Sequence, residues 1–272
     1  MIPHDLITEW RQIAPWTQNY QVEQDLVICR ALVDIFNHPV LGKNLAFRGG
    51  TALFKLHMPA VRYSEDIDLV QINAGPIGEL MDGIRDVITP WLGKPKWKQT
   101  QGRVTFRYRF ESEDGPLLTL KIEINTREHF SVYGYKKIPL TVNSRWFSGS
   151  ADILTYELDE LLGTKTRALY QRKKGRDLFD LWFALTNGVP SPEVKRVIES
   201  FLKYMEYGEF PISRALFEQN LVEKQLDEKF NTDIEPLLTS DIDWDFNRAF
   251  NFIMEILIAN LPGDPWQGHN KG

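Results

Sequence analysis

The sequence predicts an α+β protein in which a first half rich in strands is followed by a mostly helical second half. A strand, a Gly-Gly turn, a helix and a second strand follow one another between residues 44 and 70. Two segments of alternating polar and apolar residues form a hairpin between residues 103 and 125, and apolar residues recur at helical spacing from Thr155 onward. The expected domains are residues 1–150 and 151–272, with the boundary at the turn-like "FSGSAD".

The composition indicates a globular protein of a reducing compartment. Of the 272 residues 43% are hydrophobic, which is enough for a substantial core. No segment approaches the roughly 18 uninterrupted apolar residues of a membrane span. A single cysteine, Cys29, excludes a disulfide framework, and the polar start "MIPHDLITEW" lacks the pattern of a secretory signal. We therefore expect a cytoplasmic protein without membrane contact.

Local patterns locate the elements of the first half. In "NYQVEQDLVICRALVDIF" apolar residues recur every three or four positions, which is typical of an amphipathic helix, and "NHP" then ends it. Next come a buried strand in "NLAF", a helix in "TALFKL" that opens on Thr51, and a strand in "DIDLV". A further helix, "IGELMDGIRDVITPWL", precedes the hairpin of "RVTFRYRF" and "LLTLKIEIN".

Two acids in the strand "DIDLV" are the first candidates for chemistry. Side chains two residues apart share one face of a strand, so Asp66 and Asp68 project together while Ile67 and Leu69 face the core. Carboxylates so placed repel each other unless a cation lies between them. Because Mg²⁺ prefers oxygen ligands and bridges carboxylates to phosphates, we expect a magnesium site, with Mn²⁺ as the alternative ion. The other interpretation is a pair of solvated acids on an exposed edge strand.

A paired glycine lies ahead of these acids. A Gly-Gly turn between a strand and a helix lets backbone N–H groups approach a phosphate, and Gly49 and Gly50 stand at such a turn. Thr51 is expected to cap the helix and to contact the phosphate. Together with the acidic strand, the turn predicts a phosphate cradle and a metal site in one strand-helix-strand unit.

The predicted hairpin supplies a third acid and several cations. Glu123 lies on the polar face of "LLTLKIEIN", where it is available beside the two aspartates as a third metal ligand. The facing strand places Arg103, Arg107 and Arg109 on one side. These arginines either pair with phosphates or line a solvated sheet face.

A lysine interrupts the apolar stripe of the helix in "YELDELLGTKTRALY". A buried ammonium group is costly unless it is paired, so Lys165 either pairs with Asp177 and Asp180 on the next helix or extends its charged end to the surface. Six basic residues and no acid fall between Lys165 and Arg176. This run is either a solvated helix face or a groove for phosphates.

The motifs "VEQDL", "FRGGTAL" and "RYSEDIDLV", followed by "RDLFD", resemble those of the AbiEii/AbiGii-type nucleotidyltransferase toxins of bacterial toxin–antitoxin systems. The resemblance implies a DNA polymerase β-like nucleotidyltransferase core with a mixed sheet in residues 1–150. It also implies that residues 151–272 form a helical domain that completes the nucleotide site.

The same resemblance implies roles for individual residues. The implied metal ligands are Asp66, Asp68 and Glu123, and the implied catalytic set adds Lys165, Asp177 and Asp180. The implied nucleotide-binding residues are Gly49, Gly50, Thr51, Ser64, Lys165 and Arg167.

The implied activity is metal-dependent transfer of a nucleoside monophosphate from an NTP to an acceptor, with release of pyrophosphate. The acceptor is expected to be RNA such as a tRNA 3′ end, and the protein partner a cognate antitoxin. One alternative is nucleotidylation of a protein or small-molecule hydroxyl on the same core, because a fold and a metal site do not choose the acceptor. Another is a non-catalytic module that binds nucleotide or antitoxin, against which the intact Gly-Gly-Thr and Asp-x-Asp elements count.

Overall fold

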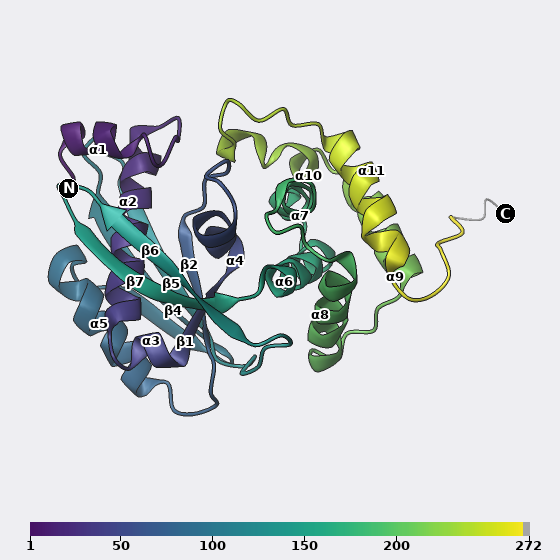
Figure 1. Ribbon diagram of the computed structural model, residues 1–272, viewed down its shortest axis with the longest axis horizontal. Helices are drawn as coiled ribbons and strands as arrows, with labels where there is room; N and C mark the ends of the chain where they lie inside the picture. The colour runs from purple at the N-terminus through teal and green to yellow at the C-terminus, as the bar shows by residue number, and fades with distance from the viewer. Residues whose placement is uncertain (269–272) are drawn as a thin grey trace. The chain divides into compact units, whose positions relative to one another are not determined.

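The computed structural model describes residues 1–268 and contains two compact units, the first of which is Met1–Glu157 (Figure 1). The second unit begins at Leu158, later than the predicted boundary at residue 150. The difference arises because the turn-like "FSGSAD" lies mostly inside β7 (Ser148–Tyr156). That strand pairs with neighbours on both sides, so the chain stays in the sheet until Tyr156.

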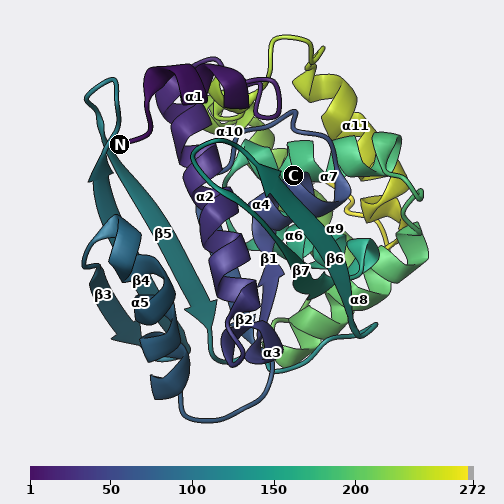
Figure 2. The same ribbon diagram turned by 60° about the vertical axis from the view of Figure 1, so that its left-hand side comes forward.

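The first unit is built on a seven-stranded mixed sheet in the order β3-β4-β5-β2-β1-β7-β6 (Figure 2). Strands β2 and β5 are parallel, as are β1 and β7, whereas the other neighbours are antiparallel. Besides β7, the strands are β1 (Leu45–Arg48), β2 (Asp66–Gln71), β3 (Lys96–Thr100), β4 (Arg103–Glu111), β5 (Leu117–Asn125) and β6 (Tyr135–Asn143). The predicted α+β class with a mixed sheet is confirmed.

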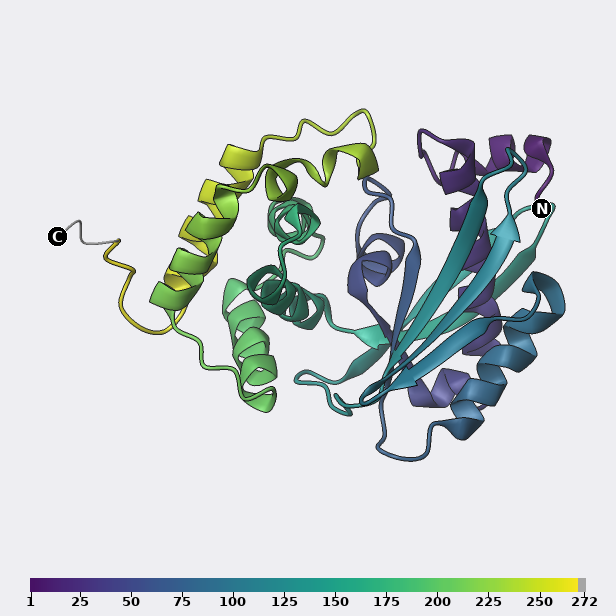
Figure 3. The same cartoon turned by 180° about the vertical axis from the view of Figure 1, so that it is seen from behind.

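Helices cover both faces of the sheet. The long helices α2 and α5 lie on one side and α4 on the other (Figure 3). The helices of this unit are α1 (His4–Trp10), α2 (Asn19–Asn37), α3 (Leu41–Asn44), α4 (Gly49–Ala52), a π-helical turn η1 (Leu53–His57) and α5 (Gly78–Leu92). The side with α2 and α5 carries the apolar residues of β4 and β5, among them the fully buried Phe106 and Ile122.

Two parts of the sheet were not anticipated from the sequence. Strand β3 is exposed at every position, so it has no apolar alternation to indicate a strand, and it is held by its pairing with β4. The β6–β7 hairpin was missed although Ile138, Leu140 and Val142 alternate with exposed residues in β6; because β6 is at the edge of the sheet, only Val142 in it is buried. Edge strands need less apolar surface than central ones, which weakens their signal.

The second unit is helical throughout its described part, as predicted. Its helices are α6 (Leu158–Gln171), α7 (Gly175–Asn187), α8 (Val194–Tyr207), α9 (Arg214–Gln225), α10 (Glu228–Thr232), η2 (Glu235–Leu237), α11 (Phe246–Ile256) and η3 (Ile258–Asn260). None of the helices formed by residues 1–268 is both long enough and apolar enough to cross a membrane.

A buried carboxylate on α2 ties three segments of the first unit together. The Asp25 side chain accepts hydrogen bonds from the indole N–H groups of Trp10 and Trp16, each at 3.0 Å. It also accepts from the Lys55 ammonium group at 2.5 Å. Because Lys55 lies in η1, directly after α4, this contact fixes the segment that follows the glycine turn against α2.

We expect Asp25→Ala to lower the free energy of unfolding by about 3–5 kcal/mol, because it leaves a buried ammonium group and two indole donors without their acceptor. The matched control is Asp34→Ala on the same helix, whose salt bridge to Arg30 is 3.6 Å long and partly exposed. Its loss should cost less than about 1 kcal/mol. Urea unfolding followed by circular dichroism measures both, and equal losses would contradict the anchoring role.

Candidate active site

Strand β2 places two carboxylates on one face of the sheet. Asp66 lies opposite Lys121 and Asp68 opposite Glu123 on β5, while Asp68 also lies opposite Arg48 on β1. The intervening Ile67 is fully buried on the other face. Because β2 is paired on both sides, it is a central strand, and the interpretation of two acids on an edge strand is wrong.

The two aspartates differ in their electrostatic surroundings. Burial and the neighbouring Asp66 carboxylate raise the pKa of Asp68, and the positive charges of Lys121 and Arg48 only partly oppose this. The Asp68 carboxylate is therefore short of positive charge in the protein alone. A cation at this position would relieve the repulsion between the two acids.

Glu123 is occupied by protein cations rather than free beside the aspartates. The Lys121 ammonium nitrogen lies 3.1 Å from Asp66 Oδ2 and 3.3 Å from Glu123 Oε2, between the two acids. Arg103 Nη1 is 3.0 Å from Glu123 Oε1. Within residues 1–268 no three His, Cys, Asp or Glu side chains are grouped to hold a metal ion. Lys121 thus separates Glu123 from Asp66 in this structure, and the role of Glu123 as a third metal ligand stays a prediction.

The glycine turn lies directly against Asp68. Gly49 has φ +85°, a backbone conformation that favours glycine, and a Cβ there would collide with Asp68 Oδ2. A Cβ on Gly50 would meet the guanidinium group of Arg62. The absence of both side chains lets the backbone of the turn lie close to a carboxylate and an arginine.

Thr51 does not cap the helix, contrary to expectation. Helix α4 begins two residues earlier, at Gly49, and no side chain caps it. The buried Thr51 hydroxyl donates to the Asp66 carbonyl oxygen at 2.5 Å. Because this bond uses its single proton, the Thr51 hydroxyl accepts a hydrogen bond from Ser64 Oγ at 2.8 Å. Thr51 and Ser64 thus join the glycine turn to the start of β2, and the expected contact of Thr51 with phosphate stays a prediction.

Arg62 is a component of the site that the sequence analysis missed. It is 2% exposed, donates to the Tyr63 carbonyl oxygen at 2.9 Å, and lies over the Phe54 ring at 4.9 Å. The available signal was the period of two in "RYSEDID", where the arginine precedes the motif serine and the two aspartates at alternate positions. A buried guanidinium group beside Gly50 is a natural partner for an anion.

The second unit holds the other predicted residues. Lys165 is 7% exposed, and its ammonium nitrogen lies 3.0 Å from Asp177 Oδ1 and 2.7 Å from Asp180 Oδ2. Arg172 donates to both oxygens of Asp177. Burial alone would raise the pKa of Asp177, but the positive charges of Lys165 and Arg172 hold this pKa well below its usual range. The pairing interpretation of Lys165 therefore holds, rather than extension to the surface.

Several charges of the basic run between residues 165 and 176 are paired within the second unit. Lys165 and Arg172 neutralise acids of α7, and Lys173 forms a salt bridge with Asp227 at 2.5 Å. The guanidinium group of Arg167 lies over the Tyr204 ring at 5.0 Å. Much of the run thus holds the helices of the second unit together, so its charge is not simply available to a groove for phosphates.

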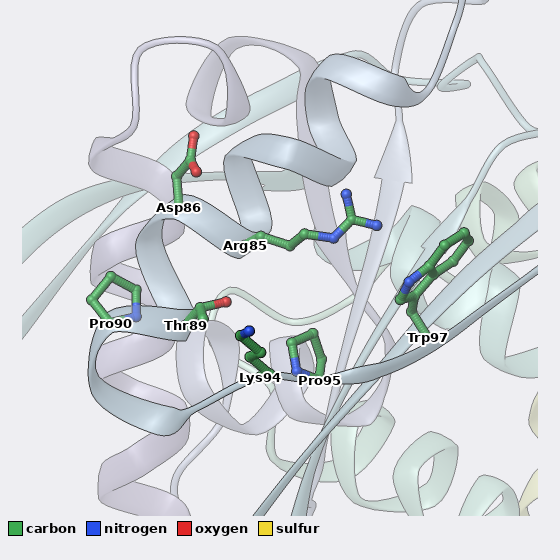
Figure 4. A pocket seen from close by; sticks show the side chains of 7 residues that line it. All are labelled: Arg85, Asp86, Thr89, Pro90, Lys94, Pro95 and Trp97. Atoms are coloured by element: carbon green, nitrogen blue, oxygen red, sulfur yellow. The ribbon is translucent and has the colours of Figure 1, made fainter.

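A separate hollow of about 490 Å³ lies between α5 and the start of β3 (Figure 4). It is lined by Arg85, Asp86, Thr89, Pro90, Lys94, Pro95 and Trp97. The Arg85 guanidinium group lies 5.2 Å from the Trp97 ring and donates to Asp82 at 2.7 Å. Trp97 projects from the face of the sheet opposite to the aspartates, so this hollow is distinct from the candidate active site.

Comparisons with solved structures concern the fold. MenT4, a nucleotidyltransferase toxin from Mycobacterium tuberculosis H37Rv, is similar in structure with a TM-score of 0.68 at 13% identity, and the match covers 97% of this chain and 92% of that chain. JHP933 from Helicobacter pylori has a TM-score of 0.56 at 18% identity, with coverage of 87% and 90%. At such identities the likeness shows the fold alone.

The sequence comparisons concern the family. No curated protein matched the sequence. The profile of the family described as nucleotidyl transferase AbiEii toxin, type IV toxin–antitoxin system, matches residues 30–252, which include the glycine turn, both aspartates and the Lys165 network. The chain therefore belongs to the AbiEii nucleotidyltransferase toxin family, as its motifs indicated.

Proposed function

We propose that this nucleotidyltransferase transfers a nucleoside monophosphate from an NTP to the hydroxyl group of an RNA, such as a tRNA 3′ end. The acceptor oxygen bonds to the α-phosphorus, the bond between that phosphorus and the α–β bridging oxygen breaks, and pyrophosphate leaves. The observation that carries the proposal is the close approach of the Gly49 backbone to the Asp68 carboxylate, on the strand that also presents Asp66.

Asp66 and Asp68 would hold Mg²⁺, or Mn²⁺ in its place. Their oxygen donors suit a hard divalent ion, and the space that a Cβ of residue 49 would fill lies against Asp68. A bound ion would neutralise phosphate charge and orient the triphosphate. Glu123 is proposed to accept the proton of the acceptor hydroxyl, and it would join the metal ligands only if the Lys121 ammonium group moved away from it.

Cations and backbone donors would bind the triphosphate. In the first unit these are the N–H groups of the Gly49–Gly50 turn and the Arg62 guanidinium group, with the Ser64 hydroxyl beside them. In the second unit Lys165 and Arg167 are proposed phosphate contacts, and Asp177 and Asp180 would orient Lys165. A cognate antitoxin in the cytosol is the proposed protein partner.

The acceptor is tested by incubating the protein with each of the four α-³²P-labelled NTPs and with total RNA, a protein extract or aminoglycosides. Label on RNA supports the proposal. Label on protein or on the small molecule alone would replace RNA by the alternative acceptor. Chelation of divalent ions should abolish the transfer.

We expect Asp66→Asn to reduce transfer at least about 100-fold, because the metal loses a charged ligand that is worth several kcal/mol in the transition state. Stability should change by less than about 1 kcal/mol, since the salt bridge to Lys121 is partly exposed. Asp152→Asn, an exposed aspartate on β7, is the control and should transfer normally. Single-turnover transfer assays measure both, and normal activity of Asp66→Asn would remove the metal site from this strand.

The glycine turn gives a second expectation. Gly49→Ala should abolish transfer, because the added Cβ displaces the Asp68 carboxylate in addition to straining the backbone. Gly93→Ala is the matched control: its φ of +83° is nearly the same, but no atom lies within 4 Å of its Cβ. Gly93→Ala should lose about 1 kcal/mol of stability in urea unfolding, and Gly49→Ala should lose more, because its Cβ also collides with Asp68. The cradle would be refuted by equal transfer rates in the two variants.

Lys165 is expected to stabilise the second unit and also to bind the NTP, and these two contributions can be measured separately. Lys165→Met should lower the free energy of unfolding by about 3–5 kcal/mol, because the buried Asp177 and Asp180 carboxylates lose the ammonium group that pairs with both. The exposed Lys195→Met on α8 should change it by less than about 0.5 kcal/mol.

The double variant Lys165→Met/Asp180→Asn restores the local charge balance and isolates the phosphate role. Its affinity for a non-hydrolysable NTP, measured by isothermal titration, should fall at least about tenfold if Lys165 contacts phosphate. Wild-type affinity in the double variant would leave Lys165 as a residue that only joins α6 to α7.

A further inference from the structure

Cations form cross-strand rows on the sheet face that carries the aspartates. Residues directly opposite each other on paired strands share a face, and the register aligns Lys96, Arg107, Lys121 and Asp66 across β3, β4, β5 and β2. The cations that this face presents are Lys96, Lys98, Arg103, Arg107, Arg109 and Lys121, which we call the cationic sheet face.

Only the cations nearest to the acids are neutralised. Lys121 pairs with Asp66 and Glu123, and Arg103 pairs with Glu123. By contrast, the side chains of four exposed residues have no ion-pair or hydrogen-bond partner within residues 1–268. They are Lys96, Lys98, Arg107 and Arg109. Positive charge therefore increases from the acids toward the β3 edge of the sheet.

This arrangement is unfavourable for the protein alone. Like charges directly opposite each other destabilise a sheet, and Arg107 stands between Lys96 and Lys121 in one row. The chain as a whole has a net charge of −5, yet the segment 96–111 carries five basic residues and a single acid. A bound polyanion would offset the repulsion that these residues create.

We propose that the cationic sheet face binds the sugar-phosphate backbone of the acceptor RNA and leads its 3′ end to Asp66 and Asp68. This inference rests on the proposed function. The row spans three strand spacings of about 4.8 Å, or about 14 Å in total, which suits several successive phosphates of a chain. A single triphosphate, whose phosphorus atoms are joined by only two bridging oxygens, is too short to reach from Asp66 to Lys96.

The experiment compares Lys96→Gln/Arg107→Gln with the control Lys43→Gln/Lys137→Gln. The control removes the same charge at exposed residues of α3 and of β6, at the other edge of the sheet. The probe is a 5′-fluorescein-labelled tRNA acceptor hairpin with a free 3′ end. Its affinity is measured by fluorescence anisotropy over a series of salt concentrations, and thermal melts verify that every variant is folded.

If the cationic sheet face binds RNA, Lys96→Gln/Arg107→Gln should bind the hairpin more weakly than the wild type, whereas Lys43→Gln/Lys137→Gln should bind it like the wild type. The plot of log Kd against log salt concentration should become shallower by about 1.4 to 1.8, since each lost phosphate contact contributes about 0.7 on the single-stranded 3′ end and about 0.9 on the duplex stem. Affinity for a non-hydrolysable NTP should not change. Failure of the wild type to bind the hairpin, or equal binding by both double variants, would overturn the inference, as would an equal loss of NTP affinity.

The outcome separates this surface from the proposed reaction. If the wild type binds the hairpin through these residues but transfers no label to RNA, the proposed acceptor is wrong and the RNA-binding surface stands. If it transfers label normally and Lys96→Gln/Arg107→Gln binds and transfers like the wild type, the reaction stands and the surface is wrong.

Discussion

The site depends on the pairing of β2 on both of its edges. With β1 on one side and β5 on the other, the strand cannot rotate, so its alternation buries Ile67 and Leu69 and forces Asp66 and Asp68 onto the opposite face. Two carboxylates held this way repel each other, and burial adds to the cost. The fold thus maintains a concentration of negative charge that only a cation can relieve.

The neighbouring elements hold the glycine turn against this strand. Thr51 and Ser64 join the turn to the backbone of β2, and Asp25 fixes Lys55 in the segment that follows it. Gly49 can then pass so close to Asp68 that no larger residue would fit. A hydrogen-bonded support of this kind keeps a phosphate-binding backbone at a fixed place beside the acids.

Positive charge has different uses in the two units. In the second unit Lys165, Arg172 and Lys173 neutralise Asp177, Asp180 and Asp227, so the most basic run of the sequence serves mainly to hold helices together. In the first unit, by contrast, Lys96, Lys98, Arg107 and Arg109 on β3 and β4 face solvent without an acidic partner among the described residues. A charge count along the chain does not distinguish these uses, because it does not show which charges are paired.

The sequence by itself determined the α+β class, the central strands, the first hairpin, the shared face of Asp66 and Asp68, and the turn at Gly49, since each follows from local periodicity or from a glycine requirement. Whether Lys165 would pair with its two aspartates or extend to the surface remained open, because its partners lie on the next helix. Only the tertiary structure decided that choice. It also decided that Lys121 lies beside Glu123, which hydrogen bonds Thr51 makes, where Arg62 lies, and which rows join Lys96 to Asp66. Each of these results from strand register or from contacts between distant segments, which no local pattern encodes.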